Sequence, residues 1–263
     1  MSSSGPIRTN ILGTAVLATV CAGVLGLPAS FPTAGAVPLV GAIEPVGPGD
    51  FTEDFFLENC DFVTRGRNTY WSLRPGWQLH LAGNDAGEEI ELFITVLDEV
   101  QVIPMVIGGE TRNVRTRVIE EREFIDGQLY EISRNFYARC AHTNSVFYFG
   151  EDVCFYENDV CVDTRGSWRA GVDGAVPGII MPGTVMLGAR YFQEQAPGVA
   201  LDRARHRQMG VTVVVPAGTL TNCLVVEEDS AIEAGAESTK VYAPGIGLIK
   251  DGVLELVEYG LIE

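Results

Sequence analysis

Closely spaced turn signals between short β-prone runs are the feature that most limits what this chain can fold into. From Trp77 onward, runs rich in Val, Ile, Tyr, Phe and Thr are separated by 83–87, Gly108-Gly109, Asp126-Gly127, Asn158-Asp159 and Asp251-Gly252. Such turns join antiparallel strands. The predicted strands cover 76–82, 88–97, 99–107, 110–124, 128–139, 145–156, 160–165, 209–216, 221–229, 237–243, 245–250 and 253–259. We therefore expect an all-β, mainly antiparallel fold, built as a single curved sheet or half barrel.

Alternation within these runs predicts one buried face and one wet face. Val114, Thr116 and Val118 share one side of a predicted strand, and Arg115 and Arg117 take the other. The next run interleaves in the same way, with Tyr130, Ile132 and Phe136 against Glu131, Ser133 and Asn135. The charged run 120–123 is expected on the wet outer face, where neighbouring charge pairs contribute only about 0.2–1 kcal/mol each.

The interval from Gly166 to Met209 interrupts this rhythm. Its first part, 166–183, combines many Gly and Pro residues with Trp168, Ile179, Ile180 and Met181, which are too apolar for a disordered linker. Loops longer than about 12–15 residues in compact domains are usually functional or disordered. We therefore expect a long Gly/Pro-rich covering loop over 166–200, acting either as a structural plug or as a binding loop. The basic run 201–207 is predicted to form a short helical turn.

The first 36 residues have the pattern of an export signal. Arg8 precedes an apolar run from Ile11 to Leu27, and Ala34-Gly35-Ala36 offers a small-x-small cleavage site. The alternative is a retained membrane anchor, which needs roughly 20 apolar residues. The predicted organisation is a signal peptide over 1–36, a flexible lead-in over 37–50 and a single antiparallel β domain over 51–263. The predicted location is secreted or periplasmic, with no integral membrane segment after processing.

The charge balance excludes some partners. The whole chain has 18 basic and 35 acidic residues; removing 1–36 takes away Arg8 alone, so the remaining charge is 17 − 35 = −18. Nucleic acids and anionic lipid surfaces are bound by concentrated Lys and Arg. We therefore expect no nucleic-acid partner.

Five cysteines follow the predicted signal peptide. Cys154 and Cys161 flank the turn signal Asn158-Asp159, so hairpin pairing places them within disulfide reach. Cys60, Cys140 and Cys223 cannot all pair within one chain, so at least one thiol is free unless two chains join through it. The three histidines are scattered singly, and no zinc-site spacing is present.

Several longer stretches carry a resemblance. They are the runs 71–76 (WSLRPG), 147–152, 166–182 (GSWRAGVDGAVPGIIMP), 191–200, 215–220 and 242–250 (YAPGIGLIK). These residues resemble an uncharacterised group of exported bacterial β-rich proteins, over most of 68–260. The resemblance implies a curved antiparallel sheet and brings no catalytic mechanism. The chain departs from the group in its cysteines and at Leu220, where an aromatic residue is common.

The sequence signals no familiar catalytic motif, phosphate loop or calcium loop. We expect an exported, non-enzymatic binding or envelope-associated protein for an apolar small molecule or a partner protein, because curved sheets can enclose apolar ligands. The candidate ligand-binding residues are Phe147, Tyr148, Trp168, Met181 and Tyr191, and the alternative is that these side chains only fill the core.

Two further alternatives rest on acidic residues. An exported glycoside-type hydrolase would use two carboxyls from Glu151, Asp152, Asp173 and Glu194. The same oxygens would suit Ca²⁺ in a divalent-cation binding protein. The leading expectation includes no cofactor.

Overall fold

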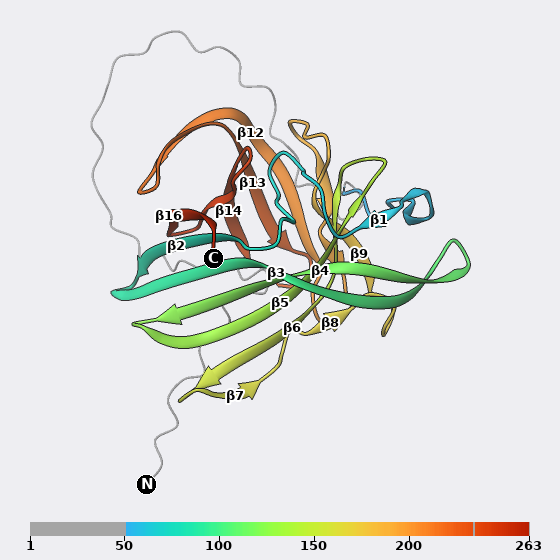
Figure 1. Cartoon of the computed structure of the whole chain (residues 1–263), viewed down its shortest axis with the longest axis horizontal. Helices are drawn as coiled ribbons and strands as arrows, with labels where there is room; N and C mark the ends of the chain where they lie inside the picture. Colours follow the sequence, from blue (N-terminus) through green and yellow to red (C-terminus); the bar gives the residue numbers. More distant parts are fainter. Residues whose placement is uncertain (1–50, 234, 263) are drawn as a thin grey trace, which may run out of the picture.

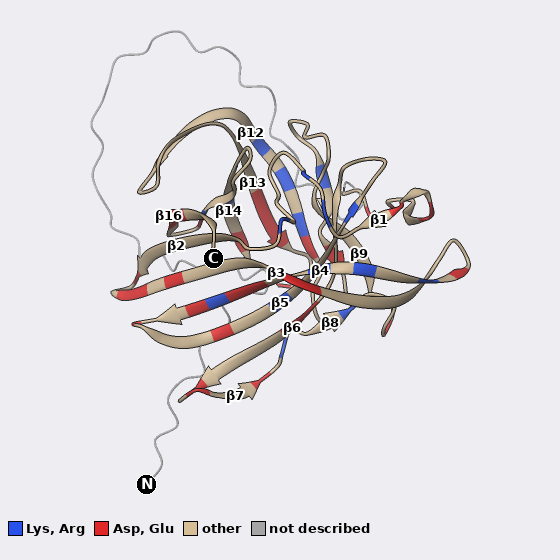
Figure 2. Cartoon of the chain, viewed as in Figure 1, with Lys and Arg blue, Asp and Glu red and all other residues tan. Residues whose placement is uncertain are grey.

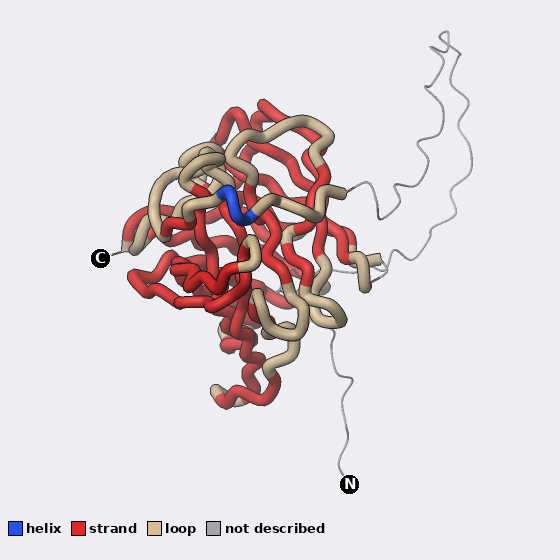
Figure 3. The backbone as a smooth tube through the Cα atoms, turned by 90° about the vertical axis from the view of Figure 1, so that its right-hand side faces the viewer, coloured by secondary structure: helices blue, strands red, loops and turns tan. Residues whose placement is uncertain are grey.

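A computed structural model describes residues 51–233 and 235–262, which are mostly strand (Figures 1 and 3). The helical element within these residues is a 3-10 helix, η2 (Leu57–Asn59). The predicted signal peptide (1–36) and lead-in (37–50) lie outside the described residues. In the described part of the chain, no helix has the length and apolar character that a membrane crossing requires.

The longer strands form two runs of hairpins. The first run contains β2 (Trp77–Asp85), β3 (Glu88–Ile107), β4 (Glu110–Ile125), β5 (Gln128–Cys140) and β6 (Val146–Glu157). The second run contains β12 (Asp202–Val215), β13 (Gly218–Ser230), β14 (Glu237–Ala243), β15 (Gly247–Asp251) and β16 (Leu254–Leu261). The shorter strands are β1 (Phe62–Val63), β7 (Val160–Asp163), β8 (Trp168–Arg169), β9 (Val176–Met181), β10 (Arg190–Phe192) and β11 (Glu194–Gln195).

One antiparallel sheet contains both runs, in the order β10-β12-β13-β14-β15-β16-β2-β3-β4-β5-β6-β9-β11. The C-terminal strand β16 pairs with β2 and so joins the two runs. The ends of the order, β10 and β11, are separated in the chain by Gln193 alone. Because β10 pairs with β12 and β11 pairs with β9, the segment 190–195 draws the two edges together into a barrel with a seam. The predicted antiparallel curved sheet is confirmed.

The interval 166–209 contributes to the wall of the barrel, which differs from the predicted covering loop. β8 and β9 both pair with β6, and β9 continues the sheet beyond it. The predicted helical turn over 201–207 is wrong, because these residues begin β12. Asp202, Ala204 and His206 are buried while the intervening arginines are less so, and this period of two is that of a strand.

Gly178 of β9 permits the close packing at the seam. A Cβ atom on Gly178 would lie 2.4 Å from the carbonyl oxygen of Phe192 and 2.5 Å from that of Gln193. Both contacts involve backbone atoms, which cannot rotate away as a side chain can. Any larger residue at this position therefore pushes β9 away from the segment that closes the barrel.

Gly178→Ala should destabilise the protein by about 1–3 kcal/mol, the usual cost of inserting a methyl group into a packed site. Gly260→Ala in β16 is the matched control, because a Cβ atom there meets no atom within 4 Å. Urea unfolding of both variants measures the difference. Equal stability of the two variants would show that the seam does not need a glycine.

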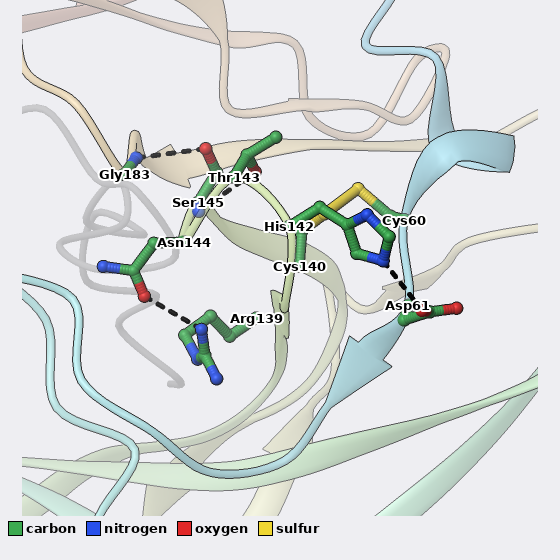
Figure 4. The surroundings of a disulfide bond; sticks show 9 residues. All are labelled: Cys60, Asp61, Arg139, Cys140, His142, Thr143, Asn144, Ser145 and Gly183. Carbon is green, nitrogen blue, oxygen red and sulfur yellow. Dashed lines mark hydrogen bonds and ion pairs between the residues drawn. A yellow bond between two sulfur atoms is a disulfide. The ribbon is translucent and has the colours of Figure 1, made fainter.

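Two disulfides are present. Cys154–Cys161 joins β6 to β7, as predicted from the sequence, and Cys60–Cys140 links the segment before β1 to the end of β5. Cys223 remains a buried free thiol. Figure 4 shows the Cys60–Cys140 bond and, beside it, the contact between His142 and Asp61. The distance from His142 Nε2 to Asp61 Oδ2 is 2.8 Å. The segment that precedes β1 is therefore fixed to the barrel wall both covalently and by a polar contact.

Loss of Cys60–Cys140 should destabilise the protein more than loss of Cys154–Cys161. The paired cysteines are 80 residues apart in the first case and 7 in the second. The chain-entropy relation gives about 4–5 and about 2–3 kcal/mol for such loops. Denaturant unfolding of Cys60→Ala/Cys140→Ala and of Cys154→Ala/Cys161→Ala tests the order, and a larger loss in the second double variant would contradict it.

Candidate functional site: an amphipathic cavity inside the barrel

The barrel encloses a cavity between its two runs of hairpins. Its apolar wall comes from β2, β3, β4, β15 and the turn before β15: Leu79, Ile94, Val96, Ile119, Leu248 and Ile246. Aromatic rings enclose it further: Trp71, Trp77, Tyr137, Tyr148 and Tyr242. Polar side chains occupy the remaining wall: Glu121, Ser133, Asn135, Lys240 and Asp251. One side of the cavity is therefore hydrocarbon and the other is polar.

The cavity is small. Its empty volume is about 770 Å³, part of which is continuous with solvent, and the centres of water molecules can reach about 70 Å³ of it. One water needs about 10–15 Å³ by this measure. The space therefore suits several waters or one compound of low molecular weight.

The alternation of β4 and β5 supplies the polar wall. Ile119, Glu121 and Glu123 occupy one face of β4, and their cross-strand partners on β5 are Asn135, Ser133 and Glu131. This face points into the barrel. The expectation of a wet outer face is therefore wrong for Glu121, Glu123, Glu131, Ser133 and Asn135. Glu120 and Arg122 occupy the opposite, outward face of β4. The expectation assumed an apolar interior, whereas this interior combines apolar side chains with a polar half. Figure 2 shows acidic residues along β3, β4, β5 and β13.

A β-bulge in β6 turns both Tyr148 and Glu151 inward. A spacing of three residues would normally place them on opposite faces. Tyr137 pairs with Tyr148 and Asn135 pairs with Glu151, so β6 has one extra residue between these pairs. Gly150 lies at this point with φ of 138°, and a Cβ atom there would be 2.5 Å from the carbonyl oxygen of Trp168. The glycine therefore fixes which side chains of β6 reach the interior.

The segment between β1 and β2 contributes Trp71 and Ser72 to the wall of the cavity. It inserts Trp71 against Tyr137 of β5 (ring centroids 5.1 Å apart) and Tyr242 of β14 (6.2 Å). The Tyr70 hydroxyl donates to the backbone oxygen of Asn222 (2.9 Å), which anchors the segment to β13. Trp71, Ser72 and Trp77 also line a surface cleft, so they form the boundary between the cavity and the outside.

The polar wall includes one buried ammonium group among carboxylates. Lys240 Nζ lies 2.9 Å from Glu228 Oε2 and 3.6 Å from Asp251 Oδ2. Burial by itself lowers the pKa of Lys240, but these two carboxylates raise it on balance, so the amine stays charged. Gln193 of the seam donates to the other oxygen of Glu228 at 2.8 Å. The ion pair therefore also holds β13 to the segment that closes the barrel.

Other interior carboxyls form no ion pair with a cation of the described residues. Glu123 and Glu131 are direct cross-strand partners, 1% and 2% exposed, and neither makes a hydrogen bond within the described residues. Burial, with a smaller contribution from nearby carboxylates, raises the pKa of Glu123 to about 8 and that of Glu131 to about 10. Burial also raises the pKa of Glu151 to about 8 and that of Glu121 to about 7, with Lys240 lowering the latter. At neutral pH most of this group is therefore protonated.

The predicted ligand-binding residues divide among several environments. Tyr148 lines the cavity, and Trp168 packs edge-on against it with ring centroids 5.2 Å apart. Phe147 packs instead against Phe62 of β1 at 5.4 Å. Met181 is fully buried. Tyr191 lies near the seam, where its hydroxyl is 3.0 Å from His206 Nε2.

The four acidic candidates do not form one group. Glu151 and Glu194 are buried, and Glu194 accepts a hydrogen bond from the backbone N–H of Asp202. Asp152 points the other way and pairs with Arg169 at 2.7 Å, while Asp173 is exposed at a turn. Among the described residues, no group of three or more His, Cys, Asp or Glu is arranged to hold a metal ion.

Sequence reasoning missed most of the cavity. Glu121, Tyr137, Lys240 and Tyr242 lie on strands that it predicted, but their inward orientation depends on how the barrel closes. Burial of Trp71 could have been predicted, because a large aromatic residue in the Pro- and Gly-containing run 71–76 gains free energy by packing against other side chains.

Comparisons of the chain with protein-family models, with curated proteins and with solved structures find no match.

Stability should fall as the pH rises from about 5 to about 8. In the unfolded chain a glutamate releases its proton near its ordinary pKa of 4.5, whereas folded Glu123 retains it to about 8. Between these values the folded state binds more protons, so raising the pH favours unfolding. Glu123→Gln mimics the protonated carboxyl and should flatten the pH dependence of Tm.

Glu110→Gln serves as the control for this measurement, because Glu110 is exposed at the start of β4. It should leave the pH profile of the wild type unchanged. A wild-type Tm that rises steadily between pH 5 and pH 8, or a Glu123→Gln profile parallel to that of the wild type, would contradict the assignment.

Proposed function

We propose that this is an exported, non-enzymatic binding protein that holds a small, largely apolar molecule inside its barrel. The observation that carries the proposal is the amphipathic cavity, in which aromatic and aliphatic side chains face a few convergent polar groups. Ligand sites of folded proteins have this composition, because apolar contacts supply affinity and a few polar groups fix orientation.

The position of the cavity supports the same proposal. Trp71, Ser72 and Trp77 border both the cavity and the surface cleft, which also contains Arg67 and Arg74. Trp77 Nε1 donates to the backbone oxygen of Ile246 at 2.9 Å and so joins the two chain segments beside this boundary. A ligand would enter by displacing this boundary rather than by opening the sheet.

Export is part of the proposal. It is supported by the leader pattern of residues 1–36 and by two disulfides, which persist in oxidising compartments. The hydrolase and the Ca²⁺-binding protein remain alternatives, and the arrangement of Asp152 and Asp173 favours neither.

Small aromatic and aliphatic compounds should quench or shift the tryptophan fluorescence, because Trp71 and Trp77 border the cavity. The panel is indole, 2-phenylethanol, hexanol and hexanoate, with binding confirmed by calorimetry. Ile119→Phe, which adds bulk to the cavity wall, should weaken binding at least tenfold. Phe56→Ala is the matched control, because Phe56 is 59% exposed and lies outside the cavity.

Two results would contradict the proposal. One is a wild-type protein that responds to no compound of the panel at millimolar concentration. The other is equal affinity of the wild type and Ile119→Phe for every compound, which would place binding elsewhere on the surface.

A further inference from the structure

Four aromatic rings meet at the cavity: Trp71, Tyr137, Tyr148 and Tyr242. Trp71 contacts both Tyr137 and Tyr242, and Tyr137 stacks on Tyr148 with centroids 4.8 Å apart. The rings come from the segment between β1 and β2 and from β5, β14 and β6, and all of them line the cavity. The faces of such rings attract cations, and groups of them form cages for organic ammonium ions.

The same space has more carboxyl groups than ammonium groups. Glu121, Asp251 and Lys240 line the cavity, and Glu228 Oε2 lies 2.9 Å from Lys240 Nζ, so three carboxyls share this region with one ammonium group. Lys240 neutralises at most one of them. Glu121 lines the cavity, is only half-buried, and makes no hydrogen bond or ion pair with any residue that the structure describes.

Deeper on the same faces of β4 and β5, Glu123 and Glu131 are almost fully buried and also lack hydrogen-bond partners. Buried polar groups are normally paired, and each unpaired one costs about 1–3 kcal/mol. Neither lines the cavity, but Glu121, two residues before Glu123 on the same face of β4, does, so a cation bound in the cavity would add positive charge beside this face.

The rings are not already occupied by a cation of the described chain. The cation–π contacts there are Arg169 over Phe136 and Arg203 over Phe51. None of these four residues lines the cavity. Lys240 is held by Glu228 and Asp251 instead, so no cation of the described residues lies over these rings. Tyr148 covers one face of Tyr137, which leaves the other face of that ring for a ligand.

We propose that the cavity binds an organic ammonium ion carried on a small apolar body, with Glu121 as its counter-ion and the rings of Trp71, Tyr137 and Tyr242 around its charge. This inference rests on the proposed function, because it names the ligand class of the same cavity. The apolar body lies against the wall of Leu79, Ile94 and Leu248. The small volume limits the ligand to a compound of low molecular weight.

The test compares two probes of the same shape, 2-phenylethylamine and 2-phenylethanol, by calorimetry on the mature protein at pH 8. The amine should bind at least tenfold more tightly than the alcohol. Glu121→Gln should weaken the amine at least tenfold and change the alcohol less than twofold. Glu110→Gln, on the exposed start of β4, should change neither affinity.

Asp251→Asn provides a second variant if Glu121→Gln fails to fold, and it should also weaken the amine selectively. Equal affinities for amine and alcohol, or an unchanged amine affinity in the folded carboxyl variants, would overturn the ammonium inference and leave the proposed function standing. If 2-phenylethylamine does not bind while any neutral compound does, the ammonium inference is likewise overturned and the proposed function stands. Failure of both probes and of the whole panel of indole, 2-phenylethanol, hexanol and hexanoate would overturn the inference and the proposed function together.

Discussion

The pairing of the segment 190–195 with both edges of the sheet is the interaction on which the rest of the structure depends. β10 pairs with β12 and β11 pairs with β9, so a single short segment converts an open sheet into a closed wall. An open edge would expose unpaired backbone groups, and closure pairs them. Closure also creates an interior, and every property of the cavity follows from that interior. Gly178 and Gln193 matter for this reason, since one permits close packing at the seam and the other connects it to Glu228.

The interior does not have the uniform apolar filling of most small barrels. Aliphatic side chains of β2, β3, β15 and β16 fill one half, while carboxyls of β4, β5, β6, β13 and β15 occupy much of the other. Burying carboxyls without cations costs free energy, and the folded state reduces that cost by keeping protons on them. Lys240 differs from these carboxyls, because its ion pairs with Glu228 and Asp251 allow its buried ammonium group to stay charged. Unpaired buried carboxyls near a small aromatic cavity lower the free energy of unfolding. Local destabilisation of this kind is common at functional sites.

The fold was largely predictable because its signals are local. Asp126-Gly127, Gly108-Gly109 and the alternating runs between them determine hairpins through the backbone preferences of neighbouring residues. The same locality predicted the Cys154–Cys161 bond, since the two cysteines lie on either side of one turn. The Cys60–Cys140 bond was not predictable, because its cysteines approach only when the segment before β1 packs beside β5.

Outside the interval 166–208, the sequence by itself determined the strands, their antiparallel pairing and the two-residue alternation that puts Glu121, Glu123, Ser133 and Asn135 on shared faces. Only the tertiary structure decided that these faces point inward. Alternation separates two faces but does not say which one a curved sheet encloses, because that choice depends on the total packing of both faces. The positions of the bulge at Gly150 and of the Trp71 side chain also depend on tertiary packing. Each aligns side chains that are far apart in the chain, so no local pattern could place them together.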